Sequence, residues 1–229
     1  MFLFLRLLLA HFFGDFVLQF DEVYEVKKKG LGGALIHYFI IFFSFVLFSM
    51  PYLNHPELWA MIIFASIGHG VQDEIKLRLV TVPAWQFVNF ILDQLIHICF
   101  IFPVFLLPFA DSIPTLPSPL MAIYNNDFLV ILAIVYIVSV FMGTDIWESF
   151  QGSYLSDSPE TGAFEIKYGM FERFVYTTAV LNWYLAPLFL VPPFLRFFSG
   201  RLGFSKEFIF NLIYASAAGL FLRRFFIHF

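Results

Sequence analysis

Long apolar runs separated by short polar stretches dominate the chain. Several runs reach about 17–25 residues, the length at which a helix crosses a bilayer. The pattern predicts an all-α fold, namely a polytopic transmembrane helix bundle of about seven spanning or re-entrant helices. The expected spans are residues 2–20, 34–50, 57–80, 85–108, 127–146, 173–195 and 206–224.

The breaks between these runs carry residues that end helices. Asp111 to Asn126 contains several prolines and shows no helical period, and Gln151 to Gly162 is the best candidate for an aqueous loop. Pro187, Pro192 and Pro193 interrupt the sixth segment, which is therefore a kinked span or a re-entrant hairpin. We expect a four-helix module with a polar His/Asp core at 1–110, followed by C-terminal transmembrane helices at 111–229 with an inner polar loop near 147–172.

Composition strengthens the membrane interpretation. The 229 residues are 60% hydrophobic and 13% charged, with a mean hydropathy of +0.82, whereas soluble domains carry about 25% charged residues. The net charge is −4 and the only basic tract is Lys27 to Lys29. This charge pattern argues against nucleic-acid binding.

The distribution of lysine and arginine predicts the orientation. If the N-terminus lies outside, nine of the 13 basic residues fall on the inner side, as cytoplasmic loops favour. These nine are Lys27, Lys28, Lys29, Lys76, Arg78, Lys167, Arg173, Arg223 and Arg224. We therefore expect the N-terminus outside and the C-terminus inside.

Histidine and aspartate recur inside the apolar runs. Three His/Asp pairs have a spacing of four residues, which places both side chains of a pair on one helix face. The pairs are His11 with Asp15, His69 with Asp73, and Asp93 with His97, and His37 is a further histidine in the second run. A charged side chain at mid-bilayer costs about 2.5–3.5 kcal/mol, so the aspartates must face the bundle interior. Neighbouring helices run in opposite directions, and each residue advances a helix by about 1.5 Å. Counted from the inner ends of their helices, all seven groups fall at similar depths. We therefore expect them in one cavity in the inner half of the bilayer.

These motifs resemble those of a known family. The segments His11–Gln19, His69–Asp73 and Asp93–His97, together with His37 and Lys76, are similar to those of small prokaryotic integral-membrane proteins known only as a domain of unknown function. The similarity covers about the first hundred residues, with a shorter shared element at 169–173. The resemblance implies a multi-pass protein of the bacterial inner membrane, but it implies no activity.

The residue types favour a metal site. A histidine and a carboxylate one turn apart present nitrogen and oxygen to one point, and helix bundles build dinuclear sites in this way. The predicted ligands are His11, Asp15, His37, His69, Asp73, Asp93 and His97. Nitrogen and oxygen ligands without thiolate suit Zn, Mn, Fe or Mg, as one or two ions. A buried hydrogen-bond network or a proton path remains an alternative.

Other polar residues are candidates for supporting roles. Gln19, Gln72, Lys76 and Gln94 are expected to orient ligands or, for Lys76, to bind an anionic substrate group. For Arg173 we expect a capping or interfacial ion pair with Glu172, and phosphate binding is the minority interpretation.

The leading functional hypothesis is a metal-dependent hydrolase acting on a lipid or lipid-linked substrate at the inner leaflet. Asp15, Asp73 and Asp93 would be its catalytic carboxylates. One alternative is a proton- or cation-coupled transporter or channel, because Asp and His also form relays. The other is a non-catalytic membrane subunit or scaffold. Membrane lipid is the expected partner, with a homo-oligomer or a second membrane protein as further candidates.

Overall fold

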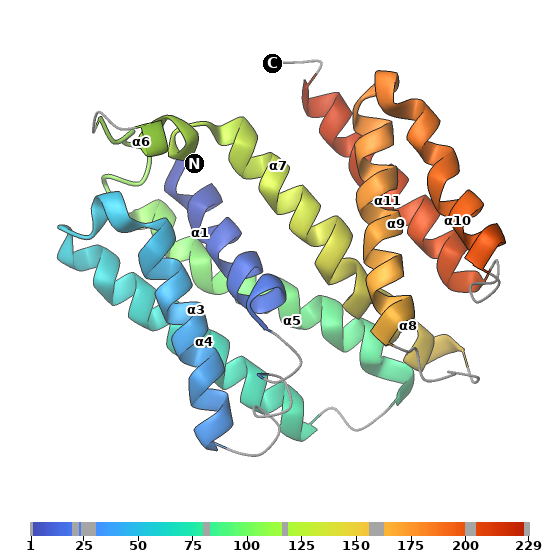
Figure 1. Ribbon diagram of the computed structural model, residues 1–229. Coiled ribbons are helices and arrows are strands. Elements are labelled where there is room, and N and C mark those ends of the chain that lie inside the picture. Colours follow the sequence, from blue (N-terminus) through green and yellow to red (C-terminus); the bar gives the residue numbers. More distant parts are fainter. Residues whose placement is uncertain are drawn as a thin grey trace. The chain divides into compact units, whose positions relative to one another are not determined.

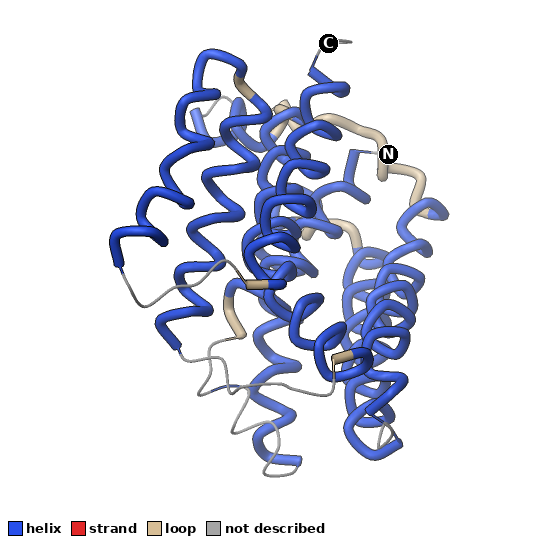
Figure 2. The backbone as a smooth tube through the Cα atoms, turned by 90° about the vertical axis from the view of Figure 1, so that its right-hand side faces the viewer, coloured by secondary structure: helices blue, strands red, loops and turns tan. Residues whose placement is uncertain are grey.

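The computed structural model describes residues 2–19, 23, 31–79, 83–115, 119–155, 163–199 and 205–226. These residues are mostly helical and contain no strand (Figure 2), which confirms the all-α expectation. The chain forms two compact units, Met1–Ile134 and Val135–Phe229, and each is described by itself. The functional division at residue 110 stays a prediction.

Unit 1 is built around four long helices that alternate in direction (Figure 1). The first, α1 (Phe2–Phe12), continues as the π-helical turn η1 (Phe13–Val17). The other elements are α3 (Leu31–Phe48), η2 (Met50–Tyr52), α4 (Pro56–Leu79), η3 (Pro83–Trp85), α5 (Gln86–Ile101), η4 (Phe102–Leu106), α6 (Pro119–Tyr124) and the first part of α7 (Asp127–Ile137). Helix α1 packs against α3 and α5, α3 packs against α4, and α4 packs against α5, so the four helices enclose a common interior.

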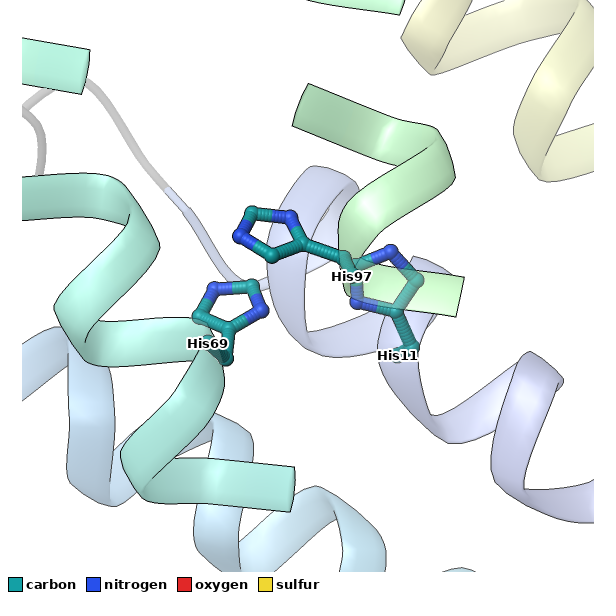
Figure 3. A group of neighbouring side chains, drawn as sticks. All are labelled: His11, His69 and His97. Atoms are coloured by element: carbon teal, nitrogen blue, oxygen red, sulfur yellow. The ribbon is translucent and has the colours of Figure 1, made fainter. Parts of the chain in front are cut away.

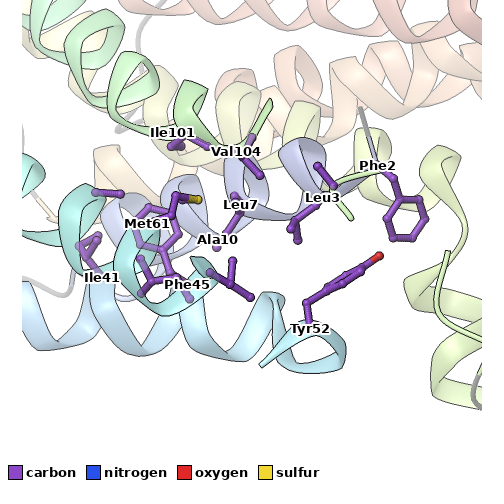
Figure 4. Packing of buried hydrophobic residues seen from close by; sticks show 14 residues of the cluster. Phe2, Leu3, Leu7, Ala10, Ile41, Phe45, Tyr52, Met61, Ile101 and Val104 are labelled. Carbon is purple, nitrogen blue, oxygen red and sulfur yellow. The ribbon is translucent and has the colours of Figure 1, made fainter. Parts of the chain in front are cut away.

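An apolar cluster packs within this interior (Figure 4). All four long helices or their continuations contribute wholly or nearly buried side chains. The members include Leu3, Leu7, Ala10, Ile41, Phe45, Leu58, Met61, Ile62, Ala65, Ile101 and Val104. Burial of about 1.5–3 kcal/mol per large apolar side chain makes this cluster the main stabilising element of unit 1.

A buried arginine, Arg6, joins several elements at the end of unit 1 where the apolar cluster lies. The Arg6 side chain is 0% exposed, and its Nε and Nη2 donate to the Tyr124 carbonyl at 3.1 and 2.6 Å. Its Nη1 donates to the Phe2 carbonyl at 3.1 Å, and the guanidinium also pairs with Asp127. The Tyr124 hydroxyl in turn donates to the Phe48 carbonyl at 2.9 Å. We call these contacts the Arg6 latch; they tie α1 and α3 to α6 and the start of α7.

The latch depends on a helix that the sequence did not predict. The expectation that residues 111–126 have no helix is wrong, because α6 forms at Pro119–Tyr124. Proline is suited to the first position of a helix, where its missing N–H would have no intrahelical partner. Nearby, Tyr52 donates to the Ser112 carbonyl, and burial raises the pKa of Tyr52 to about 12.

Unit 2 is a second helical assembly in which α9 (Ala163–Leu181) packs against its neighbours on several sides. These neighbours include α11 (Lys206–Phe226), the π-helical η5 (Val138–Met142), α8 (Gly143–Tyr154) and η6 (Trp183–Leu190), which leads into α10 (Val191–Ser199). The predicted bounds of the sixth segment, 173–195, are wrong. Helix α9 begins ten residues earlier, and Asn182 ends it and accepts a hydrogen bond from the Tyr184 N–H at 3.1 Å.

Two helices in the described residues are long and apolar enough to cross a membrane, Gln86–Leu106 and Asp127–Tyr154. The segments Ala34–Phe48 and Tyr184–Phe198 are apolar but shorter. Helix α1 with η1 ends already at Val17, and α4 carries the polar residues of the His/Asp motif, which lower its hydropathy. The predicted basic tract at 27–29 and most of the predicted loop at 151–162 lie outside the described residues, although α8 reaches Tyr154.

Candidate metal centre

Seven histidine and aspartate side chains meet in the interior of unit 1. They come from α1 and η1, from α3, from α4 and from α5, and none is more than 7% exposed. They are His11, Asp15, His37, His69, Asp73, Asp93 and His97, which we call the His/Asp cluster. The convergence predicted from their spacing is confirmed by the contacts between them.

Four atoms of the His/Asp cluster form a compact set. The Nε2 atom of His37 lies 3.2 Å from the Nε2 atom of His69, 3.3 Å from Asp15 Oδ1 and 3.3 Å from Asp73 Oδ2. The Nε2 atom of His69 lies 3.6 Å from the same Asp15 oxygen and 3.4 Å from the same Asp73 oxygen. We call these four atoms the tetrahedral set, because these five separations of 3.2–3.6 Å are those of a tetrahedron of ligand atoms. A tetrahedron also requires a similar distance between the two carboxylate oxygens.

This size matches a metal coordination shell. Ligands about 2.0–2.1 Å from a central zinc ion stand about 3.3–3.4 Å apart when they are tetrahedral. The buried His and Asp groups of this chain can hold a metal ion, and the sets with ligand atoms within 4.8 Å of one another include Asp15 with His37 and His69.

A second set lies beside the first and shares Asp73. The other oxygen of that carboxylate, Oδ1, is 4.0 Å from His97 Nε2, which is itself 3.7 Å from Asp93 Oδ1. The His97 ring stacks on the His69 ring with centroids 3.9 Å apart, and His11 approaches both rings edge-on at 5.4 Å (Figure 3). We call His11, Asp73, Asp93 and His97 the second set.

The second set contains buried polar atoms without partners. In the described part of the chain, His11 Nε2, His97 Nε2 and Asp93 Oδ1 have no hydrogen-bond partner, although each residue is at most 2% exposed. Buried polar groups are nearly always hydrogen-bonded, so each such atom calls for a bound group or a water. These three atoms are therefore candidates for coordination.

A π-helical turn sets the direction of Asp15. The Leu18 N–H donates to the Phe13 carbonyl at 3.0 Å, five residues back, so the helix widens where Asp15 lies. Such π turns are frequent at functional sites. The predicted α-helical stripe through His11, Asp15 and Gln19 is therefore wrong at its end, because Gln19 lies after the helix.

Three glycines allow the helices to approach at the His/Asp cluster. A Cβ atom on Gly14 would lie 2.9 Å from Ile41, and one on Gly68 would lie 2.6 Å from Phe100. A Cβ on Gly70 would lie 3.0 Å from the Tyr38 ring. Gly14 precedes Asp15, and Gly68 and Gly70 flank His69, so close helix packing positions the ligand atoms.

Among the described residues, Lys76, Gln94 and Gln72 lie beside the His/Asp cluster on one side. Lys76 Nζ lies 2.7 Å from Asp93 Oδ2, and the Lys76 side chain is 33% exposed. Gln94 is buried, and its Nε2 lies 3.3 Å from the same oxygen. Gln72 is half-buried on α4 next to Asp73. The apolar cluster lies toward the other end of the unit, so we call the Lys76 side, where this side chain is partly exposed, the open side.

Arg173 belongs to a different network, in unit 2. Its guanidinium donates to the Val140 carbonyl at 2.9 and 3.2 Å, to Asn211 at 2.6 Å and to Thr144 at 2.5 Å. Glu172 pairs instead with Arg196, at 2.5 and 2.7 Å. The expected Glu172–Arg173 pair is therefore wrong, because adjacent residues on a helix point about 100° apart.

The seven residues of the His/Asp cluster lie in a region that matches a known protein family. The family model described as "Protein of unknown function (DUF3307)" matches residues 3–124, more than half of the chain. The chain belongs to this family. The match includes the whole His/Asp cluster and extends through Tyr124 of the Arg6 latch, whereas no curated protein and no solved structure matches the chain.

Sequence reasoning missed an apolar groove beside the cluster. The groove has a volume of about 410 Å³ and runs between η1 and α3. Its lining residues are Phe13, Leu18, Ile36, Phe39, Ile40, Phe43, Ser44 and Leu47. The signal was a stripe of apolar residues on α3 at helical spacing, but lipid-facing residues of a membrane span show the same spacing. Only the packing of η1 against α3 distinguishes residues that line a groove from residues that face lipid.

Proposed function

We propose that this DUF3307 member is an integral-membrane, metal-dependent hydrolase that acts on a lipid or lipid-linked substrate at the inner leaflet of the bacterial cytoplasmic membrane. The observation that carries the proposal is the tetrahedral set of two imidazole nitrogens and two carboxylate oxygens. The family supplies no activity, so the chemistry of the site carries the argument.

A metal ion explains this set better than hydrogen bonds do. His37 Nε2 approaches one nitrogen and two oxygens at 3.2–3.3 Å, but an imidazole nitrogen has at most one proton to donate. Charge-assisted hydrogen bonds are also shorter, at about 2.7–2.9 Å. A cation at the centre would attract all four atoms at once, and the negative charges of Asp15 and Asp73 would compensate its charge.

The ligand types narrow the choice of ion. Two nitrogens and two oxygens without thiolate suit Zn, Mn or Fe, and Mg less well because Mg prefers oxygen alone. Such an ion would polarise a water and the scissile group. In hydrolysis the water adds OH to the carbon or phosphorus of the scissile bond, and its other proton goes to the leaving alcohol. We assign Asp15 and Asp73 to binding this ion, and Asp93, at the open side, to the second set of possible ligands.

The surroundings favour a pocket over a conduction path. A proton or cation pathway needs polar groups through both halves of the bundle. On one side of the His/Asp cluster the interior is mostly apolar, with Leu7, Ile41, Ile62 and Ile101. The buried Arg6 at that end is held by the contacts of the Arg6 latch. We therefore prefer the hydrolase to the transporter, and the tetrahedral set favours it over a scaffold with a merely structural polar core.

The apolar groove supports a lipid substrate. Phe13 and Leu18 of its wall belong to the same turn of chain as Asp15, and Ile36 precedes His37. An acyl chain in this groove would lie along α3 with its polar end near the cluster.

The membrane location rests on exposed apolar surface and on helix length. Helices Gln86–Leu106 and Asp127–Tyr154 are long and apolar enough to span, and α3 exposes Phe39 and Phe43 by about 60%. Exposed aromatic side chains of this number suit lipid contact. We propose a multi-pass arrangement with the N-terminus outside, with membrane lipid as the partner and a homo-oligomer or a second membrane protein as further candidates.

Metal analysis of the purified protein tests the proposal. We expect about one ion or more per chain in the native protein and less than about half an ion in His69→Ala, because this residue contributes to the tetrahedral set. His55→Ala is the matched control, because His55 precedes α4 at the opposite end of the unit, where its ring stacks on Phe109. Fewer than about half an ion per chain in the native protein, or equal content in His69→Ala and native protein, would contradict the metal site.

A further inference from the structure

We infer that the His/Asp cluster is a two-ion centre in which the second ion and a phosphate group bind together, so that the substrate is a lipid phosphomonoester. This inference rests on the proposed function and names its substrate class. It concerns the second set, in which Asp73, Asp93 and His97 lie within reach of one ion and His11 lies beside His97, with Lys76 at the open side.

The two oxygens of Asp73 face the two sets of ligand atoms. Asp73 directs Oδ2 toward the tetrahedral set and Oδ1 toward His97, which is the arrangement of a carboxylate that bridges two ions. Two-metal hydrolytic sites hold their ions about 3.5–4 Å apart, a span suited to such a bridge. The Nε2 atoms of His11 and His97 and Asp93 Oδ1, which have no hydrogen-bond partner among the described residues, supply further ligand atoms.

The His97 contacts of the second set are longer than the contacts of the tetrahedral set. His97 Nε2 lies 3.7 Å from Asp93 and 4.0 Å from Asp73, against 3.2–3.6 Å in the tetrahedral set. A looser set leaves coordination positions that the protein does not fill. We therefore expect the first ion to bind tightly and the second ion weakly unless another ligand completes its shell.

The net charge of the two-ion centre favours an anionic substrate. Asp15, Asp73 and Asp93 with Lys76 carry a net charge of −2, so one divalent ion makes the centre neutral and two ions leave it at +2. An uncompensated charge in a buried site is costly. A phosphomonoester dianion would neutralise the two-ion centre, whereas a carboxylic ester is uncharged and would not.

Lys76 is placed to bind the anion. Its ammonium group lies 2.7 Å from Asp93 Oδ2, on the side where the site opens, and packs near the Phe90 ring. When an ion draws the Asp93 carboxylate toward itself, the Lys76 ammonium can donate to a phosphate oxygen. Lys76 would then couple phosphate binding to binding of the second ion.

The experiment measures Mn²⁺ binding to the metal-depleted full chain in detergent. Equilibrium dialysis without phosphate should give about one ion per chain, and millimolar inorganic phosphate should bring the content to about two. Phosphate should lower the Kd of the second site for Mn²⁺ by at least about tenfold. Potassium chloride of the same ionic strength is the control. Spin-coupled Mn²⁺ pairs in the electron paramagnetic resonance spectrum should appear only with phosphate. In a further experiment, short-chain phosphatidic acid replaces inorganic phosphate. If it promotes binding of the second ion equally well at a tenfold lower concentration, the lipid phosphomonoester is the preferred anion.

Variants separate the two sites. His97→Gln and Asp93→Asn should keep the first ion and lose the second, and Lys76→Met should reduce the phosphate effect to about threefold or less. Lys167→Met, which removes an exposed lysine of unit 2, should behave as the native chain.

Each outcome bears on the inference. One ion with or without phosphate would overturn it while leaving the metal-dependent hydrolase standing. Two ions regardless of phosphate, or an undiminished phosphate effect in Lys76→Met, would also overturn it. Failure to bind any ion would overturn both proposals.

Discussion

The Arg6 guanidinium is wholly buried and makes polar contacts with three residues, Phe2, Tyr124 and Asp127. Only arginine can donate from several fixed N–H groups at once, so no other side chain would satisfy both carbonyls and the carboxylate. A single residue therefore joins the start of α1 to α6 and α7. It lies in the same helix as His11 and helps to hold that helix in place.

We expect Arg6→Met to lower the free energy of unfolding by about 2–4 kcal/mol, because it leaves buried carbonyl groups without a donor. Arg6→Lys should also destabilise the protein, because one ammonium group cannot reach the same acceptors. Denaturant unfolding in detergent measures the change, with Arg224→Met as the exposed control. A value for Arg6→Met within about 0.5 kcal/mol of that control would contradict the latch.

At this scale, the spacing of His and Asp predicted which residues meet but not which atoms touch. The pairs His69–Asp73 and Asp93–His97 do lie together within their own helices, at 3.4 and 3.7 Å. Asp15 instead contacts His37 and His69 from other helices, because the π turn redirects it. No signal in the sequence indicated that Arg6 is buried, because a long basic side chain near a helix end can reach the interface, and only the packing shows its burial.

At the scale of elements, glycine at the helix contacts sets the distances in the His/Asp cluster. Gly68 faces Phe100, so α4 and α5 approach closely beside His69 and His97. The sequence predicted this close packing, because small residues recur where membrane helices meet. It did not predict the π turns at Phe13–Val17 and Val138–Met142, which have no residue signature.

Replacement of Gly68 tests this role of close packing. In an ordinary helix Gly→Ala stabilises by about 1 kcal/mol. Here the added Cβ would lie 2.6 Å from Phe100, so we expect Gly68→Ala to destabilise the protein by about 1–3 kcal/mol. The double variant Gly68→Ala/Phe100→Leu should recover part of this loss, as the smaller side chain yields space. A stabilising effect of the single variant in the same unfolding assay would contradict the account.

The bounds of α9 show why some elements were misplaced. Glu165 and Lys167 lie in its first turns, and their charges made the segment resemble a loop in the hydropathy pattern. Buried Glu172, Arg173 and Asn211 satisfy one another across α9 and α11, so the helix tolerates polar residues along its length. Hydropathy alone cannot detect such pairing.

At the scale of the whole molecule, the family match and unit 1 agree in extent. The matched region ends at residue 124 and the compact unit at Ile134, so the unit includes the whole Arg6 latch and the match includes Arg6 and Tyr124 but not Phe2 or Asp127. The His/Asp cluster belongs wholly to this unit, while the Glu172–Arg196 and Arg173–Asn211 contacts belong to unit 2. The predicted module at 1–110 needs residues up to at least 127 to satisfy Arg6.

The proposed orientation makes a direct topological prediction. In a Cys99→Ser background, a membrane-impermeant maleimide should label Asn54→Cys in intact cells and should label Ala84→Cys only after the membrane is opened. Both positions are exposed in the structure. Protein released from membranes by alkaline carbonate would contradict the membrane location, and the reverse labelling pattern would contradict the orientation.

The most direct measurement is an experimental density map of the metal-loaded protein at the His/Asp cluster. The account predicts a strong peak about 2.0–2.2 Å from His37 Nε2, His69 Nε2 and the nearest oxygens of Asp15 and Asp73. A map from metal-loaded protein with clear density for these four side chains and no peak between them would contradict it, and so would side chains that point apart into lipid.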